Sequence, residues 1–431
     1  MKANLPAGEI ETVPGIDPAS HLNSQNMKNN IIRRLTQSLL LAALVASPVC
    51  RLEAADLNLF GTNMPPLDFH GFISQGFLLT SKYDYLGNNT KDGSFKFTEA
   101  GLNVSMNPLP RTRITAQGFL YDVGEDGKYR PFLDYASVEY TFNDYVGLRG
   151  GRIRKPGGIY NDIQDVDLAR TYVLLPQSVY DARYRDFSAS LDGGEVFGNI
   201  PLGGAGGLSY EAYAGLINIE ADSAVARLIN SSLPGGKITS FDKILEAGTQ
   251  LWWNSPFDVN GLRVGAAFGY VFNFDYNFSV PTPFGTFPFR AEAVLPVQQY
   301  SAEYLWKNWT FQAEYYNVQF SQDTTSPIAP PTHSFSITQG WYGGAAYRFN
   351  KWLEAGGYYS EYYVSGAHAA ASDASQKDAA LSFRFDPKPW WVFKLEGHYI
   401  RGTGQLDDNA DNPVRNDHGW FMFMAKTTFS F

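Results

Sequence analysis

The sequence predicts an all-β protein, a closed transmembrane antiparallel β-barrel of about sixteen strands (16–18). Three observations lead to this fold class. From about Leu67 onward, apolar and polar residues alternate with a period of two, which is the side-chain period of a β-strand. Short and long connections alternate along the chain between these segments. The last segment alternates strictly and ends on an aromatic residue, Phe431.

The composition agrees with this fold class. The 431 residues include 41 Gly, 31 Phe, 26 Tyr and 9 Trp, and aromatic residues suit strands while Gly marks turns and bulges. The mean hydropathy of −0.25 is ordinarily typical of a soluble protein. A membrane barrel is an exception, because only alternate residues of each strand face lipid. No stretch reaches the roughly 18 apolar residues that a membrane-spanning helix needs.

The N-terminal region predicts export. Residues 1–26 are polar and match no targeting pattern, so we expect a misassigned upstream start or a disordered segment. Residues 27–55 have the order of a secretory signal peptide, with basic residues, an apolar run over 38–46 and small residues at the end. Residues 56–66 would form a short N-terminal segment, and the barrel would occupy 67–431. The only cysteine, Cys50, lies within the signal, which excludes disulfides and thiolate sites from the mature chain.

The alternating pattern predicts sixteen strands, and a single-chain bacterial barrel needs an even number. The expected ranges are 68–80, 95–106, 111–122, 131–142, 145–153, 184–198, 206–219, 243–254, 261–278, 290–306, 309–322, 335–349, 351–364, 376–386, 390–401 and 417–431.

The connections divide into two kinds. Short turns, rich in Asn, Asp and Pro, are expected at 107–110, 143–144, 307–308, 350 and 387–389. Long loops are expected at 81–94, 123–130, 154–183, 220–242, 279–289, 323–334, 365–375 and 402–416. Short periplasmic turns and long extracellular loops are the arrangement of outer-membrane barrels.

The last strand carries the most specific local pattern. Phe421, Phe423, Phe429 and Phe431 share one face, and Lys426 lies on the other. This strand resembles the C-terminal signal of outer-membrane barrels, with Phe429 and Phe431 as the residues that the barrel-assembly machinery would read. The alternative is an ordinary final strand of a soluble β-protein. Lipid cannot satisfy an open sheet edge, so the sheet must close, and about sixteen strands leave a water-filled lumen.

The longest loop, 154–183, is rich in Ile, Val, Leu and Tyr, so it should pack against something. In strand number, loop order, the long third loop and the terminal Phe, the chain resembles the general porins of Gram-negative bacteria over about residues 67–431. That resemblance implies that the third loop folds into the lumen and that the protein is a homotrimer. A weaker resemblance to phosphate-selective porins lies in Gly151-Arg152, Lys155-Pro156 and Gly158.

An inward loop would bring charge into the pore. The constriction residues would be Asp162, Asp165, Asp167 and Arg170. By strand parity, the basic residues that face the lumen are Arg111, Arg113, Arg149, Arg348, Arg384 and Lys394. Opposed rows of charge in a narrow pore create a transverse field that favours polar solutes. Alternatively, these bases pair with lumen carboxylates, expected at Glu303, Glu314, Glu354 and Glu396, and only stabilise the wall.

The function predicted first is passive diffusion of small hydrophilic solutes or ions through a barrel surrounded by outer-membrane lipid and lipopolysaccharide. The alternatives are a selective channel for anions such as phosphate or for sugars, a barrel lipase or protease, and a structural or adhesive barrel with a plugged lumen. An enzyme would need a nucleophile beside a His, and no persuasive constellation exists. No cofactor or metal is expected, because the six histidines are scattered. The acidic excess, 43 Asp and Glu against 34 Lys and Arg, argues against nucleic acid.

Overall fold

The computed structural model describes residues 65–124, 126–233, 235–256, 261–364, 373–406, 412, 414–415 and 419–431. The predicted upstream segment, 1–26, and the predicted signal peptide, 27–55, lie outside these residues, as does 56–64. Among the helices of the described residues, none combines the length and the apolar character that crossing a membrane requires.

The described residues form one antiparallel sheet that closes on itself, because the last strand pairs with the first. Its strands are β1 (Asp68–Thr80), β2 (Phe97–Leu109), β3 (Thr112–Val123), β4 (Phe132–Asn143), β5 (Val146–Arg154), β6 (Ser190–Pro201), β7 (Gly207–Ile217), β8 (Lys237–Phe241), β9 (Ile244–Asn254), β10 (Leu262–Val271), β11 (Tyr276–Thr282), β12 (Gly285–Trp306), β13 (Trp309–Thr325), β14 (Thr332–Arg348), β15 (Leu353–Val364), β16 (Ser375–Lys388), β17 (Trp391–Gly402) and β18 (Trp420–Ser430).

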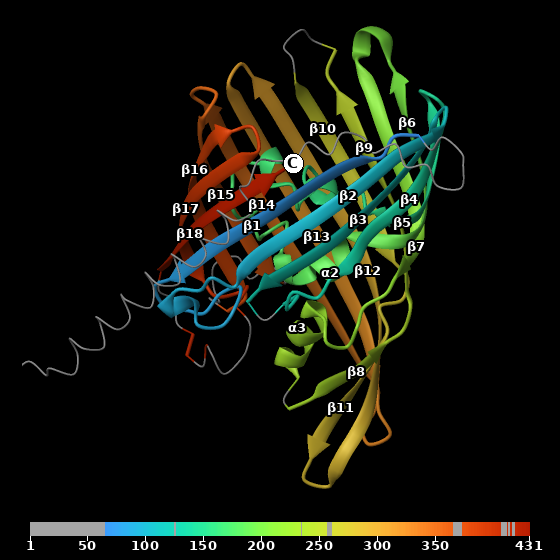
Figure 1. Ribbon diagram of the computed structural model, residues 1–431. Coiled ribbons are helices and arrows are strands. Elements are labelled where there is room, and N and C mark those ends of the chain that lie inside the picture. The colour runs from blue at the N-terminus through green and yellow to red at the C-terminus, as the bar shows by residue number, and fades with distance from the viewer. Residues whose placement is uncertain are drawn as a thin grey trace, which may run out of the picture. The chain divides into compact units, whose positions relative to one another are not determined.

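β8 and β9 together form one strand of the wall, and so do β10 and β11. β9 pairs with β7 and β10, while β8 continues the same line and pairs with β11. β10 and β11 both pair with β12. The barrel wall therefore has sixteen strands, which confirms the prediction (Figure 1).

Each of the sixteen predicted strands corresponds to one strand of this wall, with three local differences. The region predicted as a loop over 220–242 contains the strand β8. The segment predicted as a strand over 184–198 becomes β6 only at Ser190, because α2 (Arg185–Ser188) precedes it. The region predicted as a loop over 279–289 is a hairpin of β11 and β12. Its prolines and glycine suggested a loop, yet the alternation continues through them. Phe278 stacks on Phe289 across the hairpin, with 5.1 Å between ring centroids.

Side chains alternate across the wall in the predicted sense. In β18, Met422, Met424 and Lys426 point inward and are buried, while Phe421 points outward and is 62% exposed. In β16, Leu381 is 54% exposed on the outer face, and its neighbour Ser382 is fully buried inside. Apolar residues outside and polar residues inside are the arrangement of a barrel in lipid, opposite to that of a soluble barrel.

The two ends of the barrel differ. Short turns connect the strands at one end, which we call the turn end, and long connections leave the other, the loop end. At the loop end, β8, β11 and the start of β12 project beyond the wall, as Figure 1 shows. α3 (Ala224–Ser232) packs on the apolar inner face of this projection, where Val225 and Ala226 join the cluster that contains Ile238, Phe274 and Phe278.

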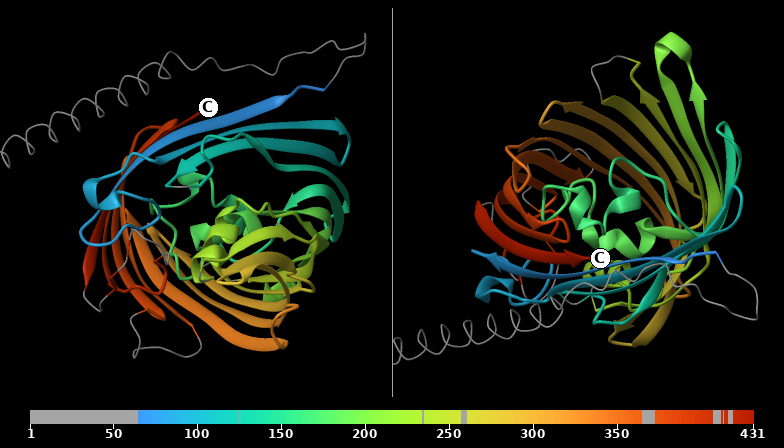
Figure 2. Two further views of the ribbon diagram at one scale, coloured as in Figure 1. Left: turned by 90° about the horizontal axis from the view of Figure 1, so that it is seen from below. Right: turned by 45° about the horizontal axis from the view of Figure 1, so that its top comes forward.

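The third long connection, residues 155–189, is called loop 3 below. It contains the one-turn 3₁₀ helices Asn161–Ile163, Asp167–Ala169 and Ala182–Tyr184 and the short helix α2. Figure 2 shows this green segment inside the ring of strands. Loop 3 lies inside the ring of strands, and its contacts with the wall define the candidate site.

Candidate functional site

Loop 3 leaves β5, crosses the lumen and is held on the inner faces of strands β12 to β18 by three groups of contacts. The first is centred on the Glu314 carboxylate of β13. It accepts hydrogen bonds from the Ile159 backbone N–H at 3.0 Å and from the Tyr180 hydroxyl at 2.5 Å, both on loop 3. From the wall it accepts the Ser301 hydroxyl at 2.6 Å and the Tyr342 hydroxyl at 2.9 Å. A buried carboxylate with this many donors is fully satisfied, so it fixes the loop firmly.

Glycines allow loop 3 to pack this closely against the barrel wall. A Cβ at Gly340 of β14 would lie 1.8 Å from the Ser178 carbonyl oxygen of loop 3. Gly158 of loop 3 has a φ of +64°, and a Cβ there would lie 2.0 Å from Gln299 Nε2. At Gly340 the contact is with backbone, so any other residue there would displace the loop from the wall; at Gly158 the left-handed φ by itself disfavours any other residue.

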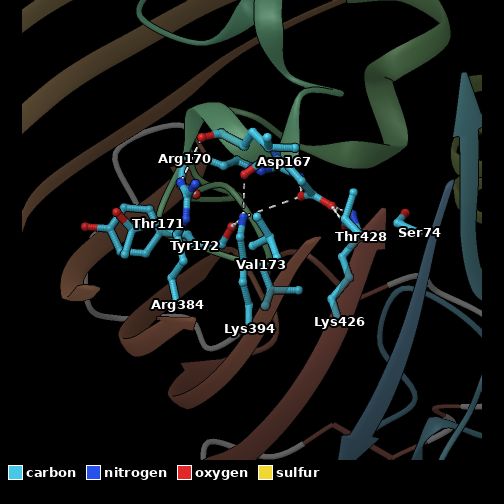
Figure 3. Close-up of polar contacts among 12 residues, drawn as sticks. Ser74, Asp167, Arg170, Thr171, Tyr172, Val173, Arg384, Lys394, Lys426 and Thr428 are labelled. Atoms are coloured by element: carbon cyan, nitrogen blue, oxygen red, sulfur yellow. Dashed lines mark hydrogen bonds and ion pairs between the residues drawn. The ribbon is translucent and has the colours of Figure 1, made fainter. Parts of the chain in front are cut away.

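The second group is centred on Asp167, whose carboxylate is buried at the base of loop 3 (Figure 3). It lies 2.8 Å from Lys426 Nζ, 3.6 Å from Lys394 Nζ and 3.1 Å from an Arg170 nitrogen. The Thr428 hydroxyl donates to it at 2.6 Å. Burial by itself would raise the pKa of the Asp167 carboxyl, but Lys426, Lys394 and Arg170 outweigh burial and hold this pKa well below its ordinary value.

The third group uses the Glu396 carboxylate of β17. It accepts the backbone N–H groups of Val173 at 2.7 Å and Leu174 at 2.9 Å. His398 Nε2 lies 3.0 Å from Glu396, and its other ring nitrogen lies 3.0 Å from Asp378. The His398 side chain has no exposed surface and lies between these two wall carboxylates.

A fourth cluster ties both ends of loop 3 to the opposite wall. Arg154 at the end of β5 contacts Asp134 at 2.8 Å and Asp165 at 3.2 Å. Arg185 contacts the same two carboxylates at 3.1 and 2.9 Å. The Arg185 guanidinium also lies over the Phe119 ring, 4.4 Å from its centroid. Two carboxylates and two guanidinium groups thus neutralise each other where the loop leaves the wall.

The wall that loop 3 leaves uncovered carries alternating charge. Arg113, Glu139, Arg149 and Glu195 are direct partners across β3, β4, β5 and β6 and form one row. Arg149 contacts Glu139 at 3.0 Å and Glu195 at 2.9 Å. Asp162, exposed on loop 3, is close enough to this row to interact electrostatically with Arg149 and Glu195. This row and Asp162 are the charges that a solute in this part of the lumen would meet.

The structure separates the residues predicted for the constriction. Asp162 is exposed, whereas Asp165, Asp167 and Arg170 are buried in the clusters described above. The expected row of three free carboxylates is therefore reduced to Asp162. The other two hold the loop in place, because loop 3 turns them toward wall cations.

The predicted basic residues also divide. Arg113, Arg149 and Arg348 face the lumen. Arg348 lies between Glu354 and Asp386. Lys394 and Arg384 face inward but lie beneath loop 3, where Arg384 donates to the Leu168 carbonyl at 2.8 Å. Arg111 is not on the wall. It occupies the turn before β3 with a φ of +64° and donates to the Phe142 carbonyl at 2.6 Å.

Of the predicted lumen carboxylates, three hold loop 3. Besides Glu314 and Glu396, Glu354 accepts the Thr171 hydroxyl. Glu303 contacts Arg263 at 2.8 Å and accepts a hydrogen bond from Gln312, which in turn accepts the Tyr160 hydroxyl of loop 3. The alternative that the predicted bases pair with these acids holds for Glu354, which contacts Arg348, whereas Glu303 pairs with an arginine that was not among them.

Several residues of the site were not predicted, namely Asp134, Arg185, Gly340 and the anchoring role of Lys426. Strand parity does place Lys426 on the inner face. Asp134 gives no such signal, because the register between β3 and β4 shifts at Gln117 and Gly118. This bulge alters the simple alternation that parity relies on.

Comparison with known proteins supports the architecture. No protein-family model and no curated protein matches the chain. Among solved structures, it is similar to OmpT, an outer membrane protein of Vibrio cholerae, with 12% identity over 86% of this chain and 99% of that chain and a TM-score of 0.53. OmpF of Salmonella typhi has 14% identity over 85% and 98%, with a TM-score of 0.51. An anion-selective porin from Comamonas acidovorans has 10% identity over 85% and 99%, with a TM-score of 0.50. The chain thus has the porin fold, a closed sixteen-stranded antiparallel barrel.

Proposed function

We propose that this protein is an outer-membrane porin through which small hydrophilic solutes and ions diffuse passively, past a constriction formed by loop 3. One observation carries the proposal. A closed sixteen-stranded wall, apolar outside and polar inside, holds its longest loop across the lumen. A wall of this size in lipid encloses a lumen wide enough for water.

In this proposal, the turn end faces the periplasm and the loop end faces the exterior. Residues 27–55 direct export, and outer-membrane lipid and lipopolysaccharide surround the apolar face. Phe429 and Phe431 are read by the barrel-assembly machinery. Phe431 lies at the seam of the barrel, where it exchanges backbone hydrogen bonds of 3.0 and 3.1 Å with Gly71.

The charges at the uncovered wall favour cations. Arg149 is shared between Glu139 and Glu195, so this group has one negative charge in excess. Asp162 adds a second, and Arg113 offsets one of them. A unit negative charge about 7 Å from a hydrated ion attracts a cation by roughly 0.6 kcal/mol in water and repels an anion by as much, so the preference for cations over anions is about sevenfold before salt screening.

Planar-bilayer recording of the folded mature chain tests this function. We expect water-filled single channels with a modest preference for K⁺ over Cl⁻. Asp162→Asn should lower the ratio of cation to anion permeability several-fold, up to about sevenfold, measured as a reversal potential in a KCl gradient. Asp323→Asn is the matched control, since that carboxylate lies far along β13 beside His333. A folded protein that conducts nothing would contradict the proposal.

The outer surface supports a homotrimer. Outward positions of β2, β3, β5 and β6 are mainly aliphatic, with Leu102, Ile114, Leu148 and Val196 all exposed; β4, which lies between β3 and β5, also carries the exposed aromatics Tyr140 and Phe142. Outward positions of later strands carry the aromatic residues of a lipid-facing surface, with examples at Trp306, Trp309, Trp341, Trp391 and Phe423. The mainly aliphatic face of β2 to β6 fits contact with another protein surface.

The trimer has its own test. Leu148→Lys together with Val196→Lys should convert a trimeric mass in mild detergent into a monomeric one, because charge would be buried at the contact. Leu381→Lys, on the aromatic side of the barrel, is the matched control and should leave the mass unchanged. If the unsubstituted protein is already a monomer by light scattering, the trimer proposal fails.

A further inference from the structure

A groove of about 800 Å³ lies on the outer face of the wall, across the adjacent strands β7, β9, β10, β12, β13 and β14. Small outward side chains form its floor, at Ala266, Ala302 and Ala313, and the last two are direct cross-strand partners. Larger outward side chains border the floor, and they include Leu208, Trp253, Val264, Tyr300, Tyr315 and Trp341. The groove exists because alanines stand among large apolar residues.

The aromatic rings at the border of the groove are held in place. The Trp253 indole N–H donates to the Ala205 carbonyl at 2.9 Å. The Tyr315 hydroxyl accepts a hydrogen bond from Gln339 Nε2 at 2.5 Å. The Tyr300 ring stacks on the Tyr315 ring, with 6.4 Å between the centroids. A ligand would not have to order these side chains, so it would lose little free energy to ordering on binding.

The groove spans the height of one leaflet. Counted from the turn end of its strand, Trp253 is the second residue of β9, Ala302 the fifth of β12 and Trp341 the eighth of β14. Strands tilted by about 40° rise roughly 2.5 Å per residue along the barrel axis, so the groove climbs about 15 Å. The hydrocarbon core of a bilayer is roughly 30 Å thick. The groove thus begins at the membrane surface on the turn side and ends near the middle of the membrane.

The surroundings of the groove favour a lipid chain as its occupant. Leu251, Val264 and Tyr300 share this outer face and are exposed to the lipid of the proposed membrane. Lipid chains are as apolar as these side chains, so packing decides where a chain is held. An unfilled groove forfeits dispersion contacts that a chain would make with the floor and both borders. A flexible methylene chain can follow the groove, whereas a second rigid barrel would need a matching ridge.

We propose that this groove binds one acyl chain of a glycerophospholipid, with its ester end beside Leu208 and Trp253 and its methyl end beside Trp341. The choice of lipid rests on the proposed function: the turn end faces the periplasm, and the periplasmic leaflet of an outer membrane contains glycerophospholipids. Lipopolysaccharide occupies the other leaflet. The lipid site is separate from the lumen and from the aliphatic face of β2 to β6.

Native mass spectrometry of the folded protein, released from detergent micelles, counts bound lipids and tests the proposal. The probe is phosphatidylethanolamine with palmitoyl chains. We expect the first lipid on each protomer to have a dissociation constant at least tenfold lower than that of later lipids. Lysophosphatidylethanolamine with a single palmitoyl chain should compete for this position, because the groove holds one chain. Glycerophosphoethanolamine, which has no acyl chain, should not compete.

Ala302→Leu together with Ala313→Leu fills the floor and should weaken binding of the first lipid at least tenfold. Ala355→Leu together with Ala379→Leu is the matched control and should leave that binding unchanged. These two residues point outward on β15 and β16, where Ala355 is the partner of the exposed Phe383, and neither lines the groove. All four substitutions add only aliphatic surface toward lipid, so both variants should fold, which their single-channel conductance verifies.

The outcomes separate this proposal from the proposed function. Lipid binding that responds to the groove variant, in a protein that conducts nothing, would contradict the proposed function and leave the lipid site standing. Normal conductance with the same affinity for the first lipid in the wild type, the groove variant and the control would overturn the lipid site. Tighter binding of lipid A that the groove variant loses, or a change from oligomer to monomer in that variant, would also overturn it, because another occupant would then fill the groove.

Discussion

Asp167→Asn should loosen loop 3 from the wall without unfolding the barrel. The carboxylate lies within 4 Å of Lys426, Lys394 and Arg170 and accepts the Thr428 hydroxyl. The amide is the same size but carries no charge. Lys394 would then retain only the backbone carbonyls of Asp167 and Tyr172 as acceptors, at 2.8 and 3.0 Å.

The size of the effect follows from burial. Removing one partner of a buried ion pair costs roughly 3–5 kcal/mol, because the remaining charges stay buried and uncompensated. At about 1.4 kcal/mol for each factor of ten, the open state of loop 3 should rise by roughly two to four orders of magnitude. The wall should be unaffected, since its sixteen strands pair through backbone hydrogen bonds that do not involve Asp167.

Two measurements would detect the loosened loop. Trypsin should cut the variant within loop 3, after Arg170 or Arg183, much faster than it cuts the wild type. Single-channel recordings should show frequent steps to higher conductance. Asp162→Asn is the control, because it removes a carboxylate from the same loop at an exposed position. If the Asp167→Asn variant shows no more conductance steps than this control and resists trypsin equally well, the anchoring role is refuted.

Two further predictions concern the same anchors. Asp167 has a lowered pKa in the anchored loop, so its stabilising contribution is present above the ordinary value near 4 and is lost only as the pH falls through the lowered value. The difference in channel noise between Asp167→Asn and the wild type should therefore persist from pH 7 to about pH 4 and vanish only in stronger acid; a difference that vanishes between pH 6 and pH 5 would contradict this. Gly340→Val should push Ser178 off β14 and raise the conductance, while Gly343→Val, whose Cβ would meet nothing within 4 Å, should leave the conductance unchanged.

The sequence was most informative where one residue pattern had one structural solution. Strict alternation with turn residues between segments predicted each of the sixteen strands, because a strand with one apolar face has a single register that keeps this face outward. It also predicted the inward side of Arg149, Lys394 and Glu314. It misplaced Arg111, since parity counting continued one residue beyond the strand into the turn.

The roles of the inward residues could not be obtained in the same way. Parity places Glu314, Glu396 and Lys394 inside, but it does not tell whether water, another wall residue or a loop lies opposite. The structure shows that each of them contacts loop 3, from a distance of more than 130 residues along the chain. Such contacts depend on how the loop turns within the lumen, which no local pattern encodes.

The sequence by itself determined the barrel, since period-two patterning, turn chemistry and strand closure follow from the chain's local preferences and from backbone hydrogen bonding. Only the tertiary structure decided which charges remain available in the lumen. Asp162 and Asp167 are five residues apart in one acidic segment, yet one is exposed and the other is neutralised by Lys426 and Lys394. The reason is physical: the electrostatic effect of a charge depends on its burial and its partners, and both are fixed only when distant strands close around the loop.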